Sequence, residues 1–124
     1  RADLRLRGEA TMVLIEAVIK PFKLDDLKEA LEELGVGGMT VIEIMQTAAP
    51  RPGRHSADAT AIDRDMVPKI KVEIVVPRNL TERVIEAICL YGSAGKSEDG
   101  KVVIERVEGT VRIRTGDLDA DALS

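Results

Sequence analysis

The chain repeats one pattern twice: an apolar strand, a proline, and an amphipathic helix that a glycine ends. Residues 19–21 (IKP) correspond to residues 75–77 (VVP), and residues 28–31 (KEAL) correspond to residues 85–88 (IEAI). Each repeat continues into a further β-rich run, so the predicted order is β-α-β twice. With right-handed crossovers, such a duplication predicts an α+β fold, the ferredoxin-like βαββαβ sandwich.

The boundaries of the elements follow from periodicity and from turn residues. Strands are predicted at residues 13–20, 39–45, 70–76 and 101–107, with a short last strand at 110–115. The first helix carries apolar residues at i, i+3, i+4 and i+7, namely Leu27, Ala30, Leu31 and Leu34. Gly35 and Gly92 are natural stops for the two helices, and Asn79, with Glu82 three residues later, predicts where the second helix begins.

The first strand is apolar on both faces. Two apolar sets alternate along it, Val13, Ile15, Ala17 and Ile19 on one face and Leu14 and Val18 on the other. Two helices cover only one face of the sheet, and this pattern is typical of strands that are buried on both faces. The second face is therefore expected to pack on other subunits, and we predict a homo-oligomer.

Composition narrows the possible functions. The 124 residues suit one domain, and their hydrophobic fraction of 44% is enough for a packed core. With 2% aromatic residues and a net charge of −4, the chain is not expected to bind nucleic acid. A single histidine and a single cysteine argue against a metal site and against an internal disulfide. No apolar run approaches the length of about 18 residues that suggests a membrane span, and we expect a cytoplasmic protein.

Three segments fall outside the repeated pattern. Residues 47–68 contain Pro50 and Pro52 without a sustained period, so they form either a functional loop or a disordered insertion. Residues 1–11 are basic and unpatterned, and Met12 is a possible natural start. They are expected to be a disordered N-terminal extension or a remnant of cloning. Residues 117–124 are expected to form an acidic tail.

Two arginines near the end of the chain are candidate phosphate ligands. Arg112 and Arg114 would share one face of the strand at 110–115, about 6.6 Å apart, with Val111 and Ile113 facing inward. Two guanidinium groups at this spacing form a fork that suits phosphate oxygens, with Lys96 and Lys101 as the neighbouring cations. The alternative is a solvated edge strand whose charges discourage aggregation, and spacing alone favours this alternative.

Catalytic patterns are weak. Residues 95–97 (GKS) resemble the end of a P-loop, but Leu90 stands where the pattern needs its first glycine, and a helix leads into the loop. His55 has no evident nucleophile to activate, and Cys89 is expected to be a buried structural thiol. An enzyme is therefore not predicted, and a weak ATPase remains the alternative of that class.

Several motifs resemble those of the PII signal-transduction proteins. They are the opening residues 15–26, the second-strand entry at 38–41, the strand at 68–76, and residues 95–96, 99–101 and 111–116. The resemblance covers residues 12–116 and assigns a T-loop at 47–68, a B-loop at 92–101 and a C-loop at 108–116. It implies a homotrimer that binds adenine nucleotide in clefts between its subunits.

The resemblance also implies roles for individual residues. Lys101, Arg112 and Arg114 would hold phosphates beside the backbone of Glu98, Asp99 and Gly100. Gly38, Thr40 and Val75 would line the base and ribose, and the T-loop would contact target proteins. On this basis the arginine fork is interpreted as a nucleotide site.

This sequence departs from the family pattern in the T-loop and in the B-loop. Pro50 replaces the glutamine that helps to hold magnesium and 2-oxoglutarate, and Ile62 replaces the tyrosine that is uridylylated. Glu98 replaces a glycine and brings a carboxylate near the phosphates, which disfavours a highly charged nucleotide. We therefore predict that ADP or AMP binds at least as well as Mg-ATP, that no metal is required, and that 2-oxoglutarate binds poorly.

The partner and the effector are left open by the sequence. The resemblance implies a membrane transporter, a metabolic enzyme or its regulator as the target, in nitrogen or carbon metabolism. A small anion such as bicarbonate is a possible effector in an inorganic-carbon sensor, with Lys69, Arg51 and Arg54 as its counter-charges. The alternative, which we favour from the sequence, is that these arginines face solvent. A scaffold that has lost nucleotide binding is a further alternative.

Overall fold

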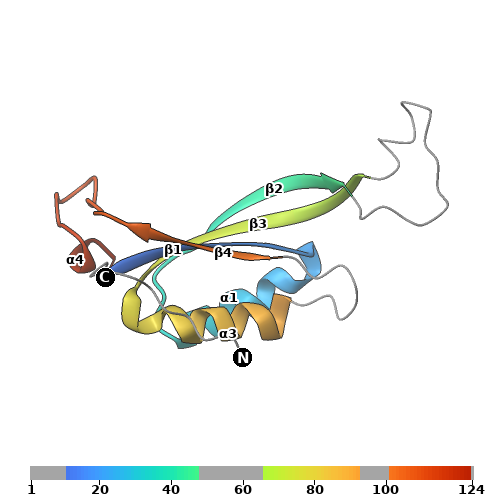
Figure 1. Ribbon diagram of the computed structural model, residues 1–124, viewed down its shortest axis with the longest axis horizontal. Coiled ribbons are helices and arrows are strands. Elements are labelled where there is room, and N and C mark those ends of the chain that lie inside the picture. The colour runs from blue at the N-terminus through green and yellow to red at the C-terminus, as the bar shows by residue number, and fades with distance from the viewer. Residues whose placement is uncertain (1–10, 48–65, 93–100, 124) are drawn as a thin grey trace.

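The computed structural model describes residues 11–47, 66–92 and 101–123 of the chain. Its elements in chain order are β1 (Met12–Ile19), η1 (Pro21–Lys23), α1 (Leu24–Glu33), β2 (Thr40–Thr47), β3 (Met66–Pro77), η2 (Arg78–Leu80), α3 (Thr81–Gly92), β4 (Val102–Val107) and α4 (Ala120–Leu123). Helices α1 and α3 pack beside each other on one face of the sheet, and among the described residues no long helix lies on the opposite face (Figure 1). The predicted ferredoxin-like sandwich is confirmed.

The four strands form one sheet in the order β2-β3-β1-β4, and each neighbouring pair is antiparallel. The repeated halves meet in its middle, where β1 pairs with β3 from Met12 opposite Pro77 to Ile19 opposite Ile70. Strand β4 pairs with the other edge of β1 and ends at Val107, opposite Met12. The repeat seen in the sequence is therefore a structural repeat around the central pair of strands.

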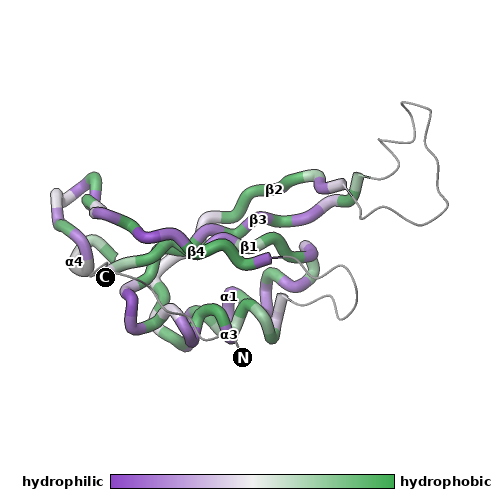
Figure 2. The backbone as a smooth tube through the Cα atoms, viewed as in Figure 1, coloured by the Kyte–Doolittle hydropathy of each residue, from purple (hydrophilic) through white to green (hydrophobic). Residues whose placement is uncertain are grey.

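The core lies between the sheet and the two long helices. Figure 2 shows hydrophobic residues along β1 and on the helices that face it. Alternate side chains of β1 and β3 point into this core, because successive residues of a strand face opposite sides. The buried cluster consists of Val13, Ile15, Ala17, Ile19, Leu27, Leu31, Ile70, Val72, Ile74, Val76, Val84, Ala87 and Ile88.

On the opposite face of the sheet, the side chains of β1 are half-buried. Leu14, Glu16 and Val18 of β1 are all of intermediate exposure, so this strand is apolar on both faces as predicted. Lys71 lies among them and pairs with Glu16 at 3.6 Å and with Glu73 at 3.5 Å. An apolar surface with a charged group at its centre is available here for contact with other chains.

Helix α1 ends at the predicted glycine. Gly35 adopts φ 84, its N–H donates to the Glu32 carbonyl at 3.0 Å, and the Val36 N–H donates to the Leu31 carbonyl at 3.0 Å. This pair of hydrogen bonds is the Schellman motif, which glycine favours because it has no Cβ. The start of α3 was predicted less well, because Asn79 lies in η2 and the α-helix begins at Thr81.

The β2–β3 hairpin is longer than predicted. Strand β2 reaches Thr47, and β3 begins at Met66, so both ends of the predicted loop 47–68 belong to strands. Beyond Ile70, where pairing with β1 ends, β2 and β3 continue as a two-stranded ribbon that projects from the sheet (Figure 1). Pro68 is tolerated in this ribbon because this part of β3 pairs with β2 alone.

Candidate functional site

The segment after β4 folds back on itself at one end of the sheet. Val111 forms an isolated antiparallel bridge with Leu118, and the Arg112 N–H donates to the Asp117 carbonyl at 2.8 Å. Gly116 has φ 75, and its N–H donates to the Arg112 carbonyl at 2.7 Å. A glycine in the left-handed region permits this tight reversal. The predicted strand at 110–115 is therefore wrong, because the chain turns after Val111.

The geometry predicted for the two arginines is wrong for the same reason. Val111 is 63% exposed and Ile113 is 101% exposed, so neither faces inward as expected. Spacing of i and i+2 places side chains on one face only in an extended strand, and these residues lie in a turn. Arg114 is exposed, whereas Arg112 is half-buried and its Nη2 donates to the Ala122 carbonyl of α4 at 2.7 Å.

Helix α4 connects Arg112 with the glycines that precede β2. A Cβ added to Gly37 would lie 3.2 Å from the Leu123 carbonyl oxygen, so α4 packs closely against this segment. Gly38, the next residue, has open space where its Cβ would be, and the exposed Thr40 begins β2. Arg112 and the predicted base-lining segment therefore lie at the same end of the sheet. Val75 lies on β3 opposite Leu14, half-buried.

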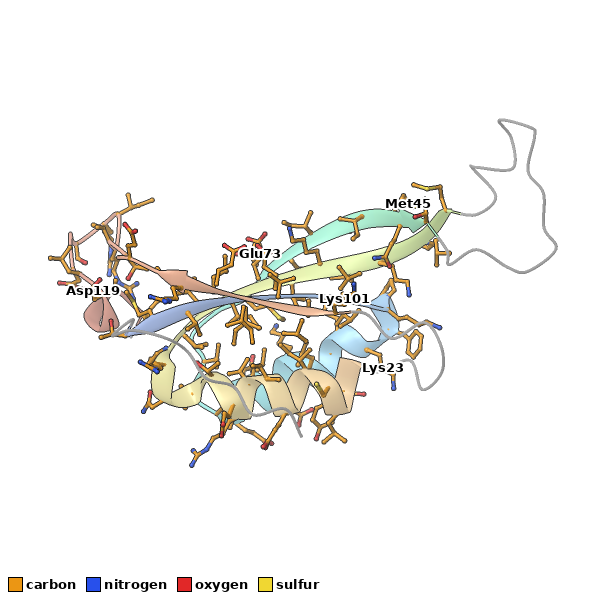
Figure 3. All side chains as sticks on the ribbon, viewed as in Figure 1. Lys23, Met45, Glu73, Lys101 and Asp119 are labelled. Atoms are coloured by element: carbon orange, nitrogen blue, oxygen red, sulfur yellow. The ribbon has the colours of Figure 1, made fainter. Side chains whose placement is uncertain are left out.

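Lys101 lies at the other end of the sheet. It precedes β4, whose first residue pairs with Ala17 near the end of β1, and Figure 3 shows it far from Asp119 of the C-terminal segment. Six residues of β4 separate Lys101 from that segment, which is roughly 20 Å at about 3.3 Å per residue. One chain therefore does not bring Lys101 together with Arg112 and Arg114, contrary to the local cluster that the sequence suggested.

Lys69 lies at the same end of the sheet as Lys101. It is on β3 at the base of the ribbon, opposite Ile44 of β2, and it is 8% exposed. The remaining predicted site residues, Arg51, Arg54, Glu98, Asp99 and Gly100, lie outside the described residues.

Helix α4 is the part of the site that the sequence did not predict. Residues 117–124 were interpreted as an acidic tail, yet four of them form this helix. The sequence contained one signal for this helix, because Asp119, a residue type favoured before a helix, precedes Ala120. In the structure the Asp119 carbonyl accepts the Ala122 N–H at 2.9 Å.

The described residues, 11–47, 66–92 and 101–123, offer neither a metal-binding cluster nor a membrane-spanning helix. They contain no group of three or more His, Cys, Asp or Glu side chains that could hold a metal ion. Within those ranges, no helix has both the length and the apolar character needed to cross a membrane.

Comparisons with known proteins agree with this architecture. The family model of nitrogen regulatory protein P-II matches residues 12–117. The nitrogen regulatory protein P-II of Haemophilus influenzae is 41% identical over 112 residues, which are 90% of this chain and all of that protein. The Azospirillum brasilense protein of the same description is 43% identical over the same shares. The crystal structure of Arabidopsis thaliana PII bound to citrate superposes with a TM-score of 0.75 at 26% identity, covering 93% of this chain and 92% of that one.

The match includes both halves of the repeat, the ribbon and the C-terminal turn. It combines sequence identity above 40% with full coverage of the relatives' length. The chain belongs to the nitrogen regulatory protein P-II family.

Proposed function

We propose that this chain is a regulatory signal transducer that binds adenine nucleotide in clefts between subunits. The relatives of this chain are described as nitrogen regulatory proteins. The observation that carries the proposal is the separation of Lys101 from Arg112 and Arg114 at opposite ends of one sheet. A polyphosphate is held well only when several cations contact it, and two chains arranged head to tail bring the two ends together.

A ring of three chains closes this arrangement. A head-to-tail contact uses a different surface on each side, so it repeats until the ring closes, and the family resemblance implies a trimer. Each cleft would then combine Lys101 and the 98–100 backbone of one chain with Arg112, Arg114, Gly38 and Thr40 of the next. The half-covered face of β1, with Leu14 and Val18, is the natural inner surface of such a ring.

The nucleotide preference follows from two residues of the sequence. Glu98 adds a negative charge beside the phosphates, which weakens binding most for the nucleotide with the largest charge. Pro50 offers no side-chain oxygen to a magnesium ion. ADP or AMP is therefore expected to bind at least as tightly as Mg-ATP.

The ribbon formed by β2 and β3 is the proposed route to a partner protein. It projects from the sheet and leads into residues 48–65, and nucleotide in the cleft would bias this segment toward or away from the partner. A membrane transporter or a metabolic enzyme or regulator fits this role, and this chain would contact it from the cytoplasm.

A second candidate function is a sensor of a small anion such as bicarbonate. The observation that favours it is Lys69, whose side chain is 8% exposed at the base of the ribbon. A lysine with so little exposed surface is stabilised by a counter-charge, and a small anion bound by Lys69, Arg51 and Arg54 could supply it. Bicarbonate titrations with and without ADP test this, because a true effector changes ADP affinity and ADP changes its affinity by the same factor.

Mixed oligomers test whether the nucleotide site lies between chains. Lys101→Ala alone and Arg114→Ala alone should each weaken ADP binding by about tenfold or more in calorimetry, because each removes a charge-assisted contact. When the two variants are co-expressed in equal amounts, random assortment leaves about one cleft in four with both cations intact. Recovery of that fraction of tight sites is the expected result.

A site contained in one chain gives a different result. Every chain in the mixture then lacks one cation, and no tight site returns. The same samples also test the ATPase alternative, because phosphate release from ATP that disappears in Lys101→Ala would show turnover in this site.

A further inference from the structure

Helix α4 is a single turn that the C-terminal segment builds with its own hydrogen bonds. Asp119 adopts φ 54, which is uncommon for a residue with a side chain, and it begins the turn. Its Oδ1 accepts the Thr110 N–H at 3.3 Å, and its carbonyl accepts the Thr110 hydroxyl at 3.2 Å and the Ala122 N–H at 2.9 Å. These contacts attach α4 to the residues that follow β4.

The free end of α4 lies against two parts of the proposed nucleotide site. The Ala122 carbonyl accepts a hydrogen bond from Arg112 Nη2 at 2.7 Å, and the Leu123 carbonyl lies where a Cβ on Gly37 would come within 3.2 Å. The last carbonyls of a helix have no partner within the helix and carry partial negative charge. The Ala122 carbonyl therefore presents to Arg112 the kind of acceptor that a phosphate oxygen presents.

We propose that α4 is a built-in competitor of the nucleotide: it holds Arg112 when the cleft is empty, and the nucleotide's phosphate displaces it. This inference rests on the proposed nucleotide function. Affinity for nucleotide is then reduced by the fraction of molecules in which α4 is in place. Release of α4 also frees the surface at Gly37 and Gly38, so occupancy of the cleft changes the position of the C-terminal segment.

The alternative is that α4 orients Arg112 for the nucleotide. Arginine has five N–H donors, and one of them can remain on the Ala122 carbonyl while others contact phosphate. The two roles predict opposite changes in nucleotide affinity when α4 is removed. Removing a competitor tightens nucleotide binding, and removing a support weakens it.

One substitution separates the two roles. Ala122→Pro removes the N–H that bonds to Asp119 and disfavours a helical Asp121, so α4 should unwind while Arg112 remains. Ala122→Ser keeps that N–H and is the matched control. Calorimetry with ADP should show affinity about three- to tenfold tighter for Ala122→Pro than for the natural chain and for Ala122→Ser. In an Arg112→Ala background the proline should have a smaller effect, because only the contact of α4 at Gly37 is then left to release.

The outcomes are distinguishable. Equal ADP affinity of the natural chain and Ala122→Pro, or weaker binding by Ala122→Pro, overturns the competitor role and leaves the proposed function standing. Absence of ADP binding in every variant, the natural chain included, overturns the proposed function and this inference with it. Hydrogen exchange gives an independent readout: ADP should speed exchange of the Ala122 amide in the natural chain, and unchanged protection at saturating ADP contradicts displacement.

Discussion

Gly92 is a position at which one added methyl group should have a calculable effect on the free energy of unfolding. It is the last residue of α3, where the helix reaches the end of β1. A Cβ added there would lie 2.8 Å from Ile19 Cγ2, and 3.8 Å from both Ile19 Cβ and Ile88 Cγ2. Ile19 is 3% exposed, and its branched side chain is stiff at χ1, so the methyl group cannot swing away.

The expected cost of Gly92→Ala is a difference between two terms. Overpacking a well-filled core costs about 1–3 kcal/mol. Alanine instead of glycine in a helix returns about 0.5–1 kcal/mol, and less at a helix terminus. The net loss in the free energy of unfolding is therefore about 1–2 kcal/mol. For a domain of this size each kcal/mol lowers Tm by about 4 °C, so a decrease of about 4–8 °C is expected.

Urea unfolding followed by circular dichroism measures this loss. The protomer concentration has to be the same for every variant, because assembly contributes to apparent stability. Gly38→Ala is the matched control, since no atom lies within 4 Å of its added Cβ, and it should stay within about 0.5 kcal/mol of the natural chain. A Gly92→Ala variant as stable as the natural chain would refute the overpacking argument.

Three further substitutions test the backbone, the charged group and the open face. Gly35→Ala should lower the free energy of unfolding by about 1–2 kcal/mol, because alanine is strained at the φ of 84 that Gly35 adopts. An unchanged urea midpoint would contradict this backbone strain. Lys71→Ala should cost more than the roughly 1 kcal/mol of a surface pair, because the proposed interface would bury its pairs with Glu16 and Glu73, and a smaller cost that disappears in high salt would leave these pairs in solvent. Val103→Glu places a negative charge on the open face opposite Glu16. It should shift the sedimentation coefficient toward that of the monomer while the circular dichroism spectrum is retained. An intact oligomer would show that this face is not the interface.

The repeated halves were predicted well because their patterns report burial. The i, i+3, i+4 spacing around Leu27 and the alternation along β3 exist because those residues face one shared core, and both elements formed where periodicity put them. The stop at Gly35 was predicted for a local reason, since a left-handed residue at a helix end favours glycine.

The C-terminal segment was predicted badly because its pattern does not report burial within one chain. Alternating Val111, Arg112, Ile113 and Arg114 look like a strand with an inner and an outer face, yet Ile113 is fully exposed in the folded chain. The turn depends on Gly116 and on contacts with Thr110 and Asp119, which spacing does not encode. The predicted strand at 101–107 already implied that Lys101 and Arg112 lie far apart in one chain, and grouping the two cations overlooked the length of that strand.

The same separation determines how a nucleotide in one cleft can affect the ribbon. At one end of each sheet lie Lys101, Lys69 and the base of the ribbon, and at the other end lie Arg112 and α4. If chains meet head to tail, the nucleotide that contacts Arg112 of one chain also contacts Lys101 of the next, close to that neighbour's ribbon. One bound nucleotide would then displace α4 in one chain and also act on residues 48–65 of the next. A trimer can therefore couple α4 of one chain to the ribbon of the next through bound nucleotide, and this coupling requires no deformation of the closely packed cores.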